Sequence, residues 1–290
     1  MTAVTSAGDA APARQPRPAR RGPADLPFTF PNVELARTLA SERSEPDWLL
    51  AERVAAAEAY EALPLEKNQL YTTYVDLRSS DLIAVRPYLR TAAAPREEVA
   101  TTIPEGVAAL IELREDGVTA LALGSEATTA GVMLETFGAA LARDPDGFRA
   151  DLERGASLPA DDKLAQLARA FWNQGVRLNV PDGVRLIDPI VVRWQAGVPD
   201  RALVSRTLVR LGVDSHASIV EELVRSGPEI ACAEGEPVPQ SLFAGTLEVV
   251  LGDDSELAVA SIQDLPAGVT AFQHRHAVIG EAAKLCWALA

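Results

Sequence analysis

Three side chains near the C-terminal end of this sequence belong to residue types that ligate transition metals: His274, His276 and Cys286. His274 and His276 are two positions apart, so in a β-strand both imidazoles leave the same face. With Cys286 or a nearby acidic residue they form a candidate metal site. The alternative is a pair of ordinary polar residues on a solvated strand face, because the spacing supplies two ligands and no third.

The motifs of self-contained enzymes are missing from the sequence. The small residues from Gly124 to Gly131 lack the lysine that a Walker A loop places at the phosphates, and no G-x-G-x-x-G, G-x-S-x-G or H-E-x-x-H pattern occurs. Cys232 has no adjacent base or cation, and Cys286 is expected to be a small buried apolar residue. Glu221-Glu222 is interpreted as a solvated strand end rather than an acidic contact. We therefore predict no catalytic residue and no cofactor bound by this segment.

Composition restricts the partners and the compartment. Asp and Glu number 41 against 27 Lys and Arg, giving a formal net charge of −14, which repels phosphate backbones and disfavours nucleic acid as a partner. No apolar stretch approaches the roughly 18 residues that span a membrane, and the N-terminus has no apolar secretion signal. Two cysteines are too few for a disulfide framework. We therefore predict a cytoplasmic protein with no membrane partner.

Two regions are expected before residue 161. Residues 1–27, rich in proline, alanine and arginine, predict a disordered arm. Residues 28–160 predict a helical or α+β region. The elements expected there are a short helix capped by Asn32, a helix that starts at a Ser44–Asp47 capping box, has Pro46 in its first turn and runs to about Ala62, a strand over 71–77, a β-hairpin turning at Asp116-Gly117, and a helix over 126–142 with Met133, Phe137 and Leu141 on one face.

Residues 161–290 are expected to begin with a helix and to continue as strands. The helix covers 161–175 and ends on Gly175 in the left-handed conformation. Beyond it, apolar residues alternate at period two, which predicts strands with one buried face. These strands are expected at 176–180, 184–194, 202–211, 217–225, 242–251, 256–262 and 275–289.

Three of these segments align on Gly212, Gly252 and Gly280. The alignment predicts that residues 217–219, 257–259 and 285–287 are stacked in parallel. The separations of 40 and 28 residues are too unequal for a strict repeat. They fit a β-solenoid with turns of varying length, and an antiparallel sandwich is the alternative.

A longer motif resembles the SufB/SufD family of iron–sulfur cluster assembly proteins. The motif is a helix that ends in A-F-W-x-x-G, a strand that leads into V-P-x-G-V and a second strand that reaches P-I. In this sequence the motif comprises Lys163-Leu164, the run Ala170-Phe171-Trp172-Asn173-Gln174-Gly175-Val176-Arg177-Leu178-Asn179-Val180-Pro181-Asp182-Gly183-Val184, and Asp188-Pro189-Ile190. Weaker similarities lie in Glu45-Pro46-Asp47-Trp48-Leu49 and in Gly280-Glu281 with Lys284 and Trp287. The resemblance covers roughly residues 44–290.

The resemblance implies a fold and a function. The fold is mainly β: a right-handed parallel β-helix over 161–290, preceded by the N-terminal helical or α+β region. The function is a non-catalytic scaffold subunit of the SUF complex, paired with a SufB-type subunit and a SufC-type ABC ATPase. An iron–sulfur cluster would be held only transiently, in the assembled complex. The segment Ala277-Val278-Ile279 lacks the cysteine that SufB-type members can carry there, and no N-terminal cysteine cluster occurs, so the SufD-like branch is favoured.

Two other functional classes stay open beside the scaffold. One is a β-helical carbohydrate-active enzyme, although the aliphatic strands are poor in the aromatic and acidic residues of a sugar-binding groove. The other is a plain interaction module.

Family members are usually much longer than 290 residues, and this sequence stops in an alternating strand. We therefore expect a C-terminally truncated chain that ends in mid-core and leaves Leu285, Trp287 and Leu289 without a following layer. Such an end favours aggregation or oligomerisation. The family's cluster-related residues and its contact with the ATPase lie in later segments and have no counterpart in this sequence.

Overall fold

The structure, a computed structural model, describes residues 29–64, 80–90, 102–154, 158–227 and 238–290. The predicted arm over 1–27, the predicted strand over 71–77 and Cys232 lie outside the described residues. The helices are α1 (Val33–Glu42), α2 (Asp47–Ala62), α4 (Ser125–Thr129), α5 (Phe137–Arg143), α6 (Pro145–Arg154) and α7 (Lys163–Phe171). The strands are β1 (Arg86–Pro87), β2 (Ala109–Arg114), β3 (Gly117–Leu123), β4 (Met133–Thr136), β5 (Gln174–Val180), β6 (Ile190–Ala196), β7 (Arg201–Leu211), β8 (His216–Arg225), β9 (Ser241–Leu251), β10 (Glu256–Asp264), β11 (Val269–Ile279) and β12 (Lys284–Leu289).

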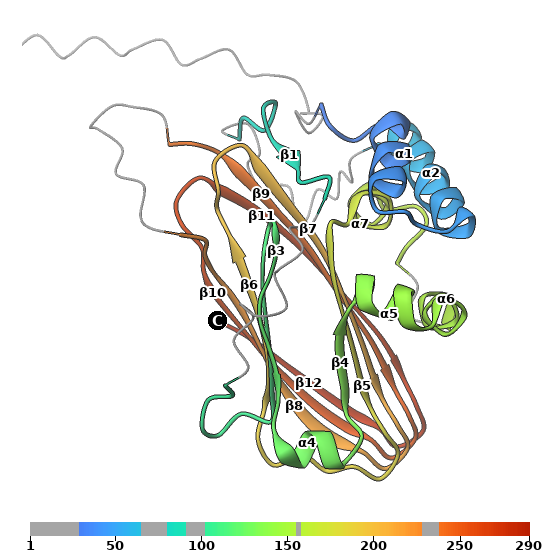
Figure 1. The fold of residues 1–290 in the computed structure, drawn as a ribbon, viewed down its shortest axis with the longest axis vertical. Coiled ribbons are helices and arrows are strands. Elements are labelled where there is room, and N and C mark those ends of the chain that lie inside the picture. The colour runs from blue at the N-terminus through green and yellow to red at the C-terminus, as the bar shows by residue number, and fades with distance from the viewer. Residues whose placement is uncertain (1–28, 65–79, 91–101, 155–157, 228–237) are drawn as a thin grey trace, which may run out of the picture.

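These strands form two sheets (Figure 1). The first sheet has the order β11-β9-β7-β5-β4, with β1 pairing to β7, and the second has the order β12-β10-β8-β6-β2-β3. From β5 to β12 successive strands alternate between the two sheets. Each strand pairs in parallel with the next strand of its own sheet, as β5 does with β7 and β6 with β8. The pairs β2–β3 and β4–β5 are antiparallel.

The predicted fold class, a mainly β right-handed parallel β-helix behind an N-terminal helical region, is wrong. Both sheets are mixed, since each contains an antiparallel pair, and helices pack on the outer face of the first sheet, so the fold is of the α/β type. The physical reason is that period-two alternation reports a strand buried on one face. It does not report the direction of the neighbouring strand, and here β3 and β4 extend the sheets in the antiparallel sense.

The glycine alignment, in contrast, is confirmed. Ala217 and Leu285 are both partners of Leu257, and Ile219 and Trp287 are both partners of Val259, all in parallel pairs. The glycines are needed because the turns before these strands stack backbone on backbone. A Cβ added to Gly252 would lie 2.8 Å from the carbonyl carbon of Gly212, closer than carbon atoms approach without strain.

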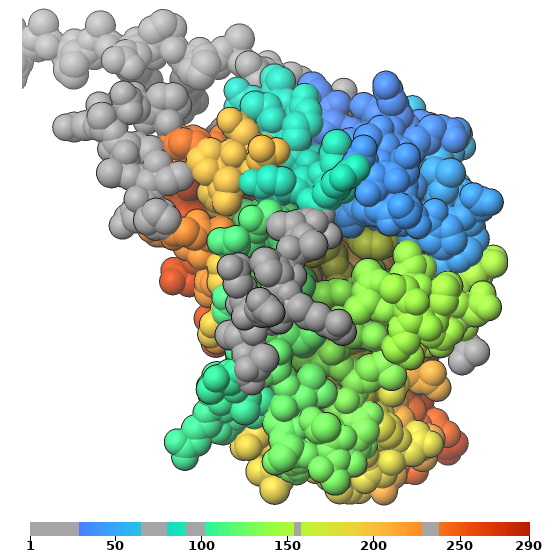
Figure 2. All heavy atoms as spheres, in the orientation of Figure 1, coloured from blue at the N-terminus to red at the C-terminus, as the bar shows by residue number. Residues whose placement is uncertain are grey.

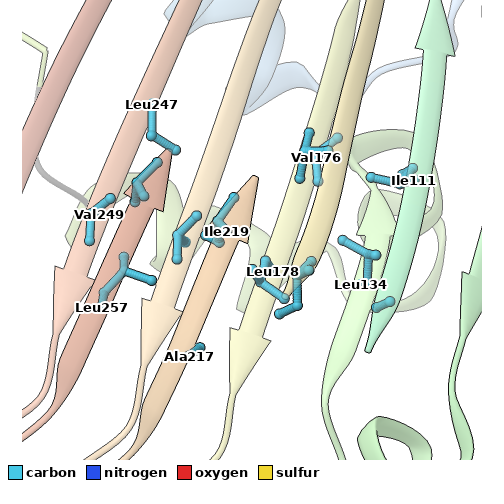
Figure 3. Packing of buried hydrophobic residues seen from close by; sticks show 14 of the residues in the cluster. Ile111, Leu134, Val176, Leu178, Ala217, Ile219, Leu247, Val249 and Leu257 are labelled. Carbon is cyan, nitrogen blue, oxygen red and sulfur yellow. The ribbon is translucent and has the colours of Figure 1, made fainter. Parts of the chain in front are cut away.

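The main core lies between the two sheets, where aliphatic side chains of both interdigitate (Figure 3). A second core joins the outer face of the first sheet to the helical layer, which we define as α1, α2, α5, α6 and α7. Phe171 at the end of α7 lies at its centre, in edge contact with Phe30 and Tyr60. The helical layer is thus part of the fold and fixes one face of the first sheet.

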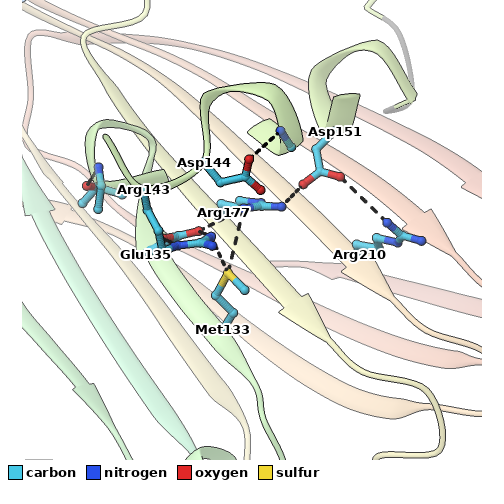
Figure 4. A network of polar contacts seen from close by, with 10 residues as sticks. Met133, Glu135, Arg143, Asp144, Asp151, Arg177 and Arg210 are labelled. Carbon is cyan, nitrogen blue, oxygen red and sulfur yellow. Dashed lines mark hydrogen bonds and ion pairs between the residues drawn. The ribbon is translucent and has the colours of Figure 1, made fainter. Parts of the chain in front are cut away.

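A network of charges also holds the helical layer to the first sheet (Figure 4). Glu135 on β4 pairs with Arg143 of α5 at 2.7 Å and with Arg177 of β5 at 3.1 Å. Arg177 also pairs with Asp151 of α6, which lies 3.8 Å from Arg210 of β7. The network therefore connects two helices to three strands.

Some of the predicted helices, caps and turns before residue 161 are confirmed, and others are wrong. The helix that ends near Ala62, the Asn32 cap and the β2–β3 hairpin are confirmed. The Ser44–Asp47 capping box is wrong, because the N-cap residue of α2 is Pro46 and has no side-chain bond to the helix. The helix over 126–142 is wrong as well: the chain forms α4, then β4, and Thr136 caps α5 by accepting from the Ala139 amide.

Gly175 does not end α7. The helix stops at Phe171, and Gly175 lies in β5 without a positive φ. Its role is close packing, since a Cβ at this position would lie 2.3 Å from the Phe137 ring. The predicted strand over 275–289 is two strands, β11 and β12, which belong to different sheets.

Candidate functional site

The structure separates the three candidate metal ligands. His274 and His276 lie on β11 of the first sheet, and Cys286 lies on β12 of the second. Arg275, between the histidines, points inward to Glu221 of the second sheet, so by alternation the two imidazoles face outward. Leu285 and Trp287 pack on the core between the sheets, so Cys286 faces outward on the opposite side. His274, His276 and Cys286 therefore do not share a site.

The two histidines do meet each other. Their rings are stacked with centroids 5.9 Å apart and an angle of 13° between the planes. The His274 Nε2 lies 3.9 Å from a carboxylate oxygen of Asp162, the residue that caps α7. Among the described residues no group of three or more His, Cys, Asp or Glu side chains has the arrangement of a metal site.

Burial lowers the pKa of the His276 imidazole below its ordinary value, and the adjacent His274 lowers it further. Glu248 and Asp162 act in the opposite direction. Since the net shift is downward, the neutral form of His276 is favoured at neutral pH. This pair is therefore a partly shielded imidazole surface on an edge strand of the first sheet.

Cys286 is exposed and forms no disulfide among the described residues. The expectation of a small buried apolar residue is therefore wrong, because Cys286 occupies the outward position of β12 between the partly buried Leu285 and Trp287. Leu289, at the end of the same strand, is 63% exposed.

A buried polar cluster joins the two sheets close to these strands. Arg275 of β11 donates through Nη2 to Glu221 of β8 at 2.8 Å and to the Ser261 hydroxyl of β10 at 2.8 Å. Ser261 in turn donates to the same Glu221 oxygen at 2.6 Å. The Nε atom of Arg275 is buried and has no acceptor among the described residues. We call these three residues the inter-sheet cluster.

Sequence reasoning missed the inter-sheet cluster. Glu221 is only 8% exposed, so the interpretation as a solvated strand end is wrong for it. Its neighbour Glu222 is different: it faces the other side of β8 and pairs with Arg193 at 2.5 Å. A signal was available, because an arginine between two outward residues of an alternating strand must face inward and needs an acidic partner.

A second buried pair lies on the outer face of the first sheet. Arg206 of β7 and Glu248 of β9 form a two-bond ion pair, with both distances 2.9 Å. Burial alone lowers the pKa of Arg206, but the Glu248 carboxylate raises it above the ordinary value overall. Arg206 is therefore a fixed positive charge, and its ion pair with Glu248 engages the carboxylate that lies beside the histidine pair.

The region that contains these groups matches a known domain. Residues 193–290 match the family model described as SUF system FeS cluster assembly, SufBD core domain. This span includes β7 to β12, both histidine positions, Cys286 and the inter-sheet cluster. No helix among the described residues is long and apolar enough to cross a membrane.

Curated iron–sulfur cluster assembly proteins are similar to most of this chain. An iron–sulfur cluster assembly SufBD family protein of Mycobacterium tuberculosis is 25% identical over 256 residues, which is 82% of this chain and 30% of that protein. The iron–sulfur cluster assembly protein SufD of Bacillus subtilis is 24% identical over 266 residues, covering 88% of this chain and 58% of SufD. SufB of the same organism is 21% identical over 272 residues, covering 88% and 55%.

This chain thus spans about a third to somewhat over half of the length of these relatives. SufB and SufD match over equal shares of it, so the similarities do not separate the two branches. The predicted resemblance itself is confirmed. The chain is therefore similar to the SufB/SufD family of iron–sulfur cluster assembly proteins, and its residues 193–290 match that family's core domain.

Proposed function

We propose that this chain is a SufD-like, non-catalytic scaffold subunit of a SUF iron–sulfur cluster assembly complex. The observation that carries the proposal is the SufBD core match over residues 193–290. The SufD-like assignment has sequence support, since the strand before Gly280 ends in Ala277-Val278-Ile279 and contains no cysteine. As a scaffold it pairs with a SufB-type subunit and a SufC-type ATPase in the cytoplasm, and the nascent cluster is cargo of the complex.

The architecture of the matched region supports the role of a rigid scaffold. Parallel strands β8, β10 and β12 are aligned residue by residue, and β7, β9 and β11 are aligned in the same way. The inter-sheet cluster and the Arg206–Glu248 pair add polar contacts with defined directions to this aliphatic framework. Such a framework keeps its shape while an ATPase partner changes conformation.

Co-purification tests this function. The tagged 290-residue chain is co-expressed with the SufB-type and SufC-type subunits of its own source, and a tagged unrelated protein serves as the control. We expect both subunits to be retained by the tagged chain at stoichiometric ratio. Absence of both subunits from the purified material would contradict the scaffold proposal.

A metal assay tests the transient nature of the cluster. After anaerobic reconstitution with iron and sulfide, we expect the isolated chain to retain no stoichiometric acid-labile sulfide. Cys286 is the one cysteine among the described residues, so Cys286→Ala is the matched variant. A stoichiometric cluster that is lost on Cys286→Ala would refute this expectation and make the chain itself a cluster-binding protein.

A further inference from the structure

A pocket of about 650 Å³ lies where the Phe171–Gly175 motif meets the helical layer. Its walls come from the end of α1 and the turn that leads into α2, from α5, and from Trp172, Asn173 and Gln174 of the motif. In Figure 2 the blue atoms of α1 and α2 lie above the yellow-green atoms of α5 and α6, and both groups of helices contribute lining residues at their ends. Small-molecule sites have volumes of about 300–1,000 Å³, so the pocket is of the size that holds a ligand.

Among the charged residues around the pocket, one positive charge has no carboxylate partner in the described part of the chain. Glu45 is paired with Arg53 at 2.6 Å, and Glu42 is paired with Arg90. Arg43, which lies between these two acids in the sequence and lines the pocket, forms no ion pair with a carboxylate of the described residues.

Arg43 is held in place by neutral groups instead. Its Nε donates to the Leu89 carbonyl at 3.0 Å, and its Nη2 donates to the Asn173 carbonyl at 3.0 Å. Burial, and after it the nearby Arg53, lower the pKa of Arg43 to about 10, while Glu45 acts in the opposite direction. The guanidinium is thus positioned, still charged at neutral pH, and poorly compensated, so an anion beside it would be stabilised.

The remaining walls are largely apolar. Phe137, Leu141 and Ala142 of α5 line one side, and Val118 of β3 lines another. Trp172 also lines the pocket, and its indole N–H is buried without an acceptor among the described residues. The pocket therefore combines one cationic group with an apolar and aromatic surface.

We propose that this pocket binds a small monocarboxylate with an apolar or aromatic body. The carboxylate pairs with Arg43, and the body packs against the Phe137 and Trp172 side of the pocket. A monoanion is favoured over a phosphate ester because the pocket offers one uncompensated positive charge beside two paired glutamates. This proposal is independent of the scaffold function.

Isothermal titration with 2-naphthoate tests the proposal on the full chain. Two other probes share its ring system: the neutral 2-naphthamide and the dianionic 2-naphthyl phosphate. We expect saturable binding of the carboxylate, and binding at least about tenfold weaker for the other two, as the loss of one charge-assisted bond predicts. No saturable binding of naphthoate, or equal or tighter binding of the amide or the phosphate, would overturn the proposal.

Two variants locate the binding. Arg43→Gln is expected to weaken naphthoate binding at least about tenfold, whereas Arg37→Gln, the same change on an exposed position of α1, leaves it unchanged. Gly138→Leu places a side chain in the pocket without a backbone clash, since the nearest atom to an added Cβ is 3.9 Å away. We expect Gly138→Leu to abolish binding and its exposed neighbour Ala139→Leu to preserve it. Unchanged affinity in the folded Gly138→Leu variant would contradict the proposed location.

Discussion

Arg53 lies in the helical layer and Arg275 lies between the two sheets, and each is buried against a glutamate. The nitrogens of Arg53 are all bonded: Nε and Nη2 to Glu45 at 2.6 and 2.7 Å, and Nη1 to the Ala170 and Trp172 carbonyls. Its guanidinium also stacks on the Trp172 ring, with 4.0 Å between the guanidinium carbon and the ring centroid. Arg275 bonds through Nη2 alone, and its Nε is buried without an acceptor among the described residues.

The difference shows how the two regions use buried charge. Around Arg53 a fully satisfied pair locks α2 to the end of α7, because each added bond offsets desolvation of the charges. The hydrogen-bonding capacity of Arg275 is only partly satisfied, and its Nη2 and the Ser261 hydroxyl donate to the same oxygen of Glu221. The first arrangement fixes the helical layer, while the second leaves a donor in the interior of the core domain.

The largest expected effect comes from removing the fully bonded arginine. Arg53→Met leaves Glu45, whose side chain is 2% exposed, as an uncompensated buried charge. We expect the free energy of unfolding to fall by about 3–5 kcal/mol, measured by urea denaturation. Arg37→Met, on the exposed side of α1, is the control and should cost little. Equal losses in the two variants would mean that the Arg53 pair contributes nothing specific.

A smaller loss is expected from Arg275→Met. Glu221 keeps its hydrogen bond from Ser261, and the side chains of Arg275 and Glu221 are 14% and 10% exposed, so the remaining charge is partly solvated. We expect a loss of about 1–3 kcal/mol in the same urea measurement.

The double variant Arg275→Met/Glu221→Leu sharpens the comparison. Removing both charges should recover most of the stability lost in Arg275→Met, because replacing a buried ion pair by apolar residues is often nearly neutral. A double variant less stable than Arg275→Met would show that Glu221 stabilises the core without its arginine.

The smallest expected effect concerns pH. Since the folded pKa of His276 is lowered, the unfolded chain binds more protons as the pH falls through the ordinary histidine pKa of about 6.5. The contribution of His276 to stability is therefore present at neutral pH and is lost on acidification below that value. The groups that act on this imidazole are His274, Glu248 and Asp162, and Arg206 is paired to Glu248.

Urea denaturation of the wild type and of His276→Gln at pH 7 and pH 5.5 measures this effect. We expect a shallower loss of stability on acidification in the variant, and His216→Gln on β8 serves as the control. A pH dependence that is the same in all three proteins would contradict a role for His276.

Some of the fold could be predicted because it depends on local pattern. Period-two alternation predicted most of the later strands, and the Gly212, Gly252 and Gly280 alignment predicted the register of β8, β10 and β12. The same approach failed at 126–142, where Met133, Phe137 and Leu141 have helical spacing but β4 pairs with β5. There the edge of the first sheet offered Met133–Thr136 a hydrogen-bonding partner, and tertiary pairing outweighed the local spacing.

The candidate site was predictable only in part. That His274 and His276 share a face follows from their spacing, but their distance from Cys286 does not, since β11 and β12 belong to different sheets. Likewise, the motif from Phe171 to Gly175 predicted a helix followed by a strand, and gave no sign that Arg43 and α5 close a pocket over it.

By itself, the sequence determined the alternation of most later strands, the register of the glycine-aligned strands and the resemblance to the SufB/SufD family, but it misplaced Cys286 and Glu221. The tertiary structure decided the mixed sheets, the meeting of Arg275 with Glu221, 54 residues apart, and the pocket at Arg43. The physical reason is that alternation and turn residues act over a few positions, so they fix which face of a strand is buried. The partner on the other side of that buried face is chosen by the packing of the two sheets and the helical layer.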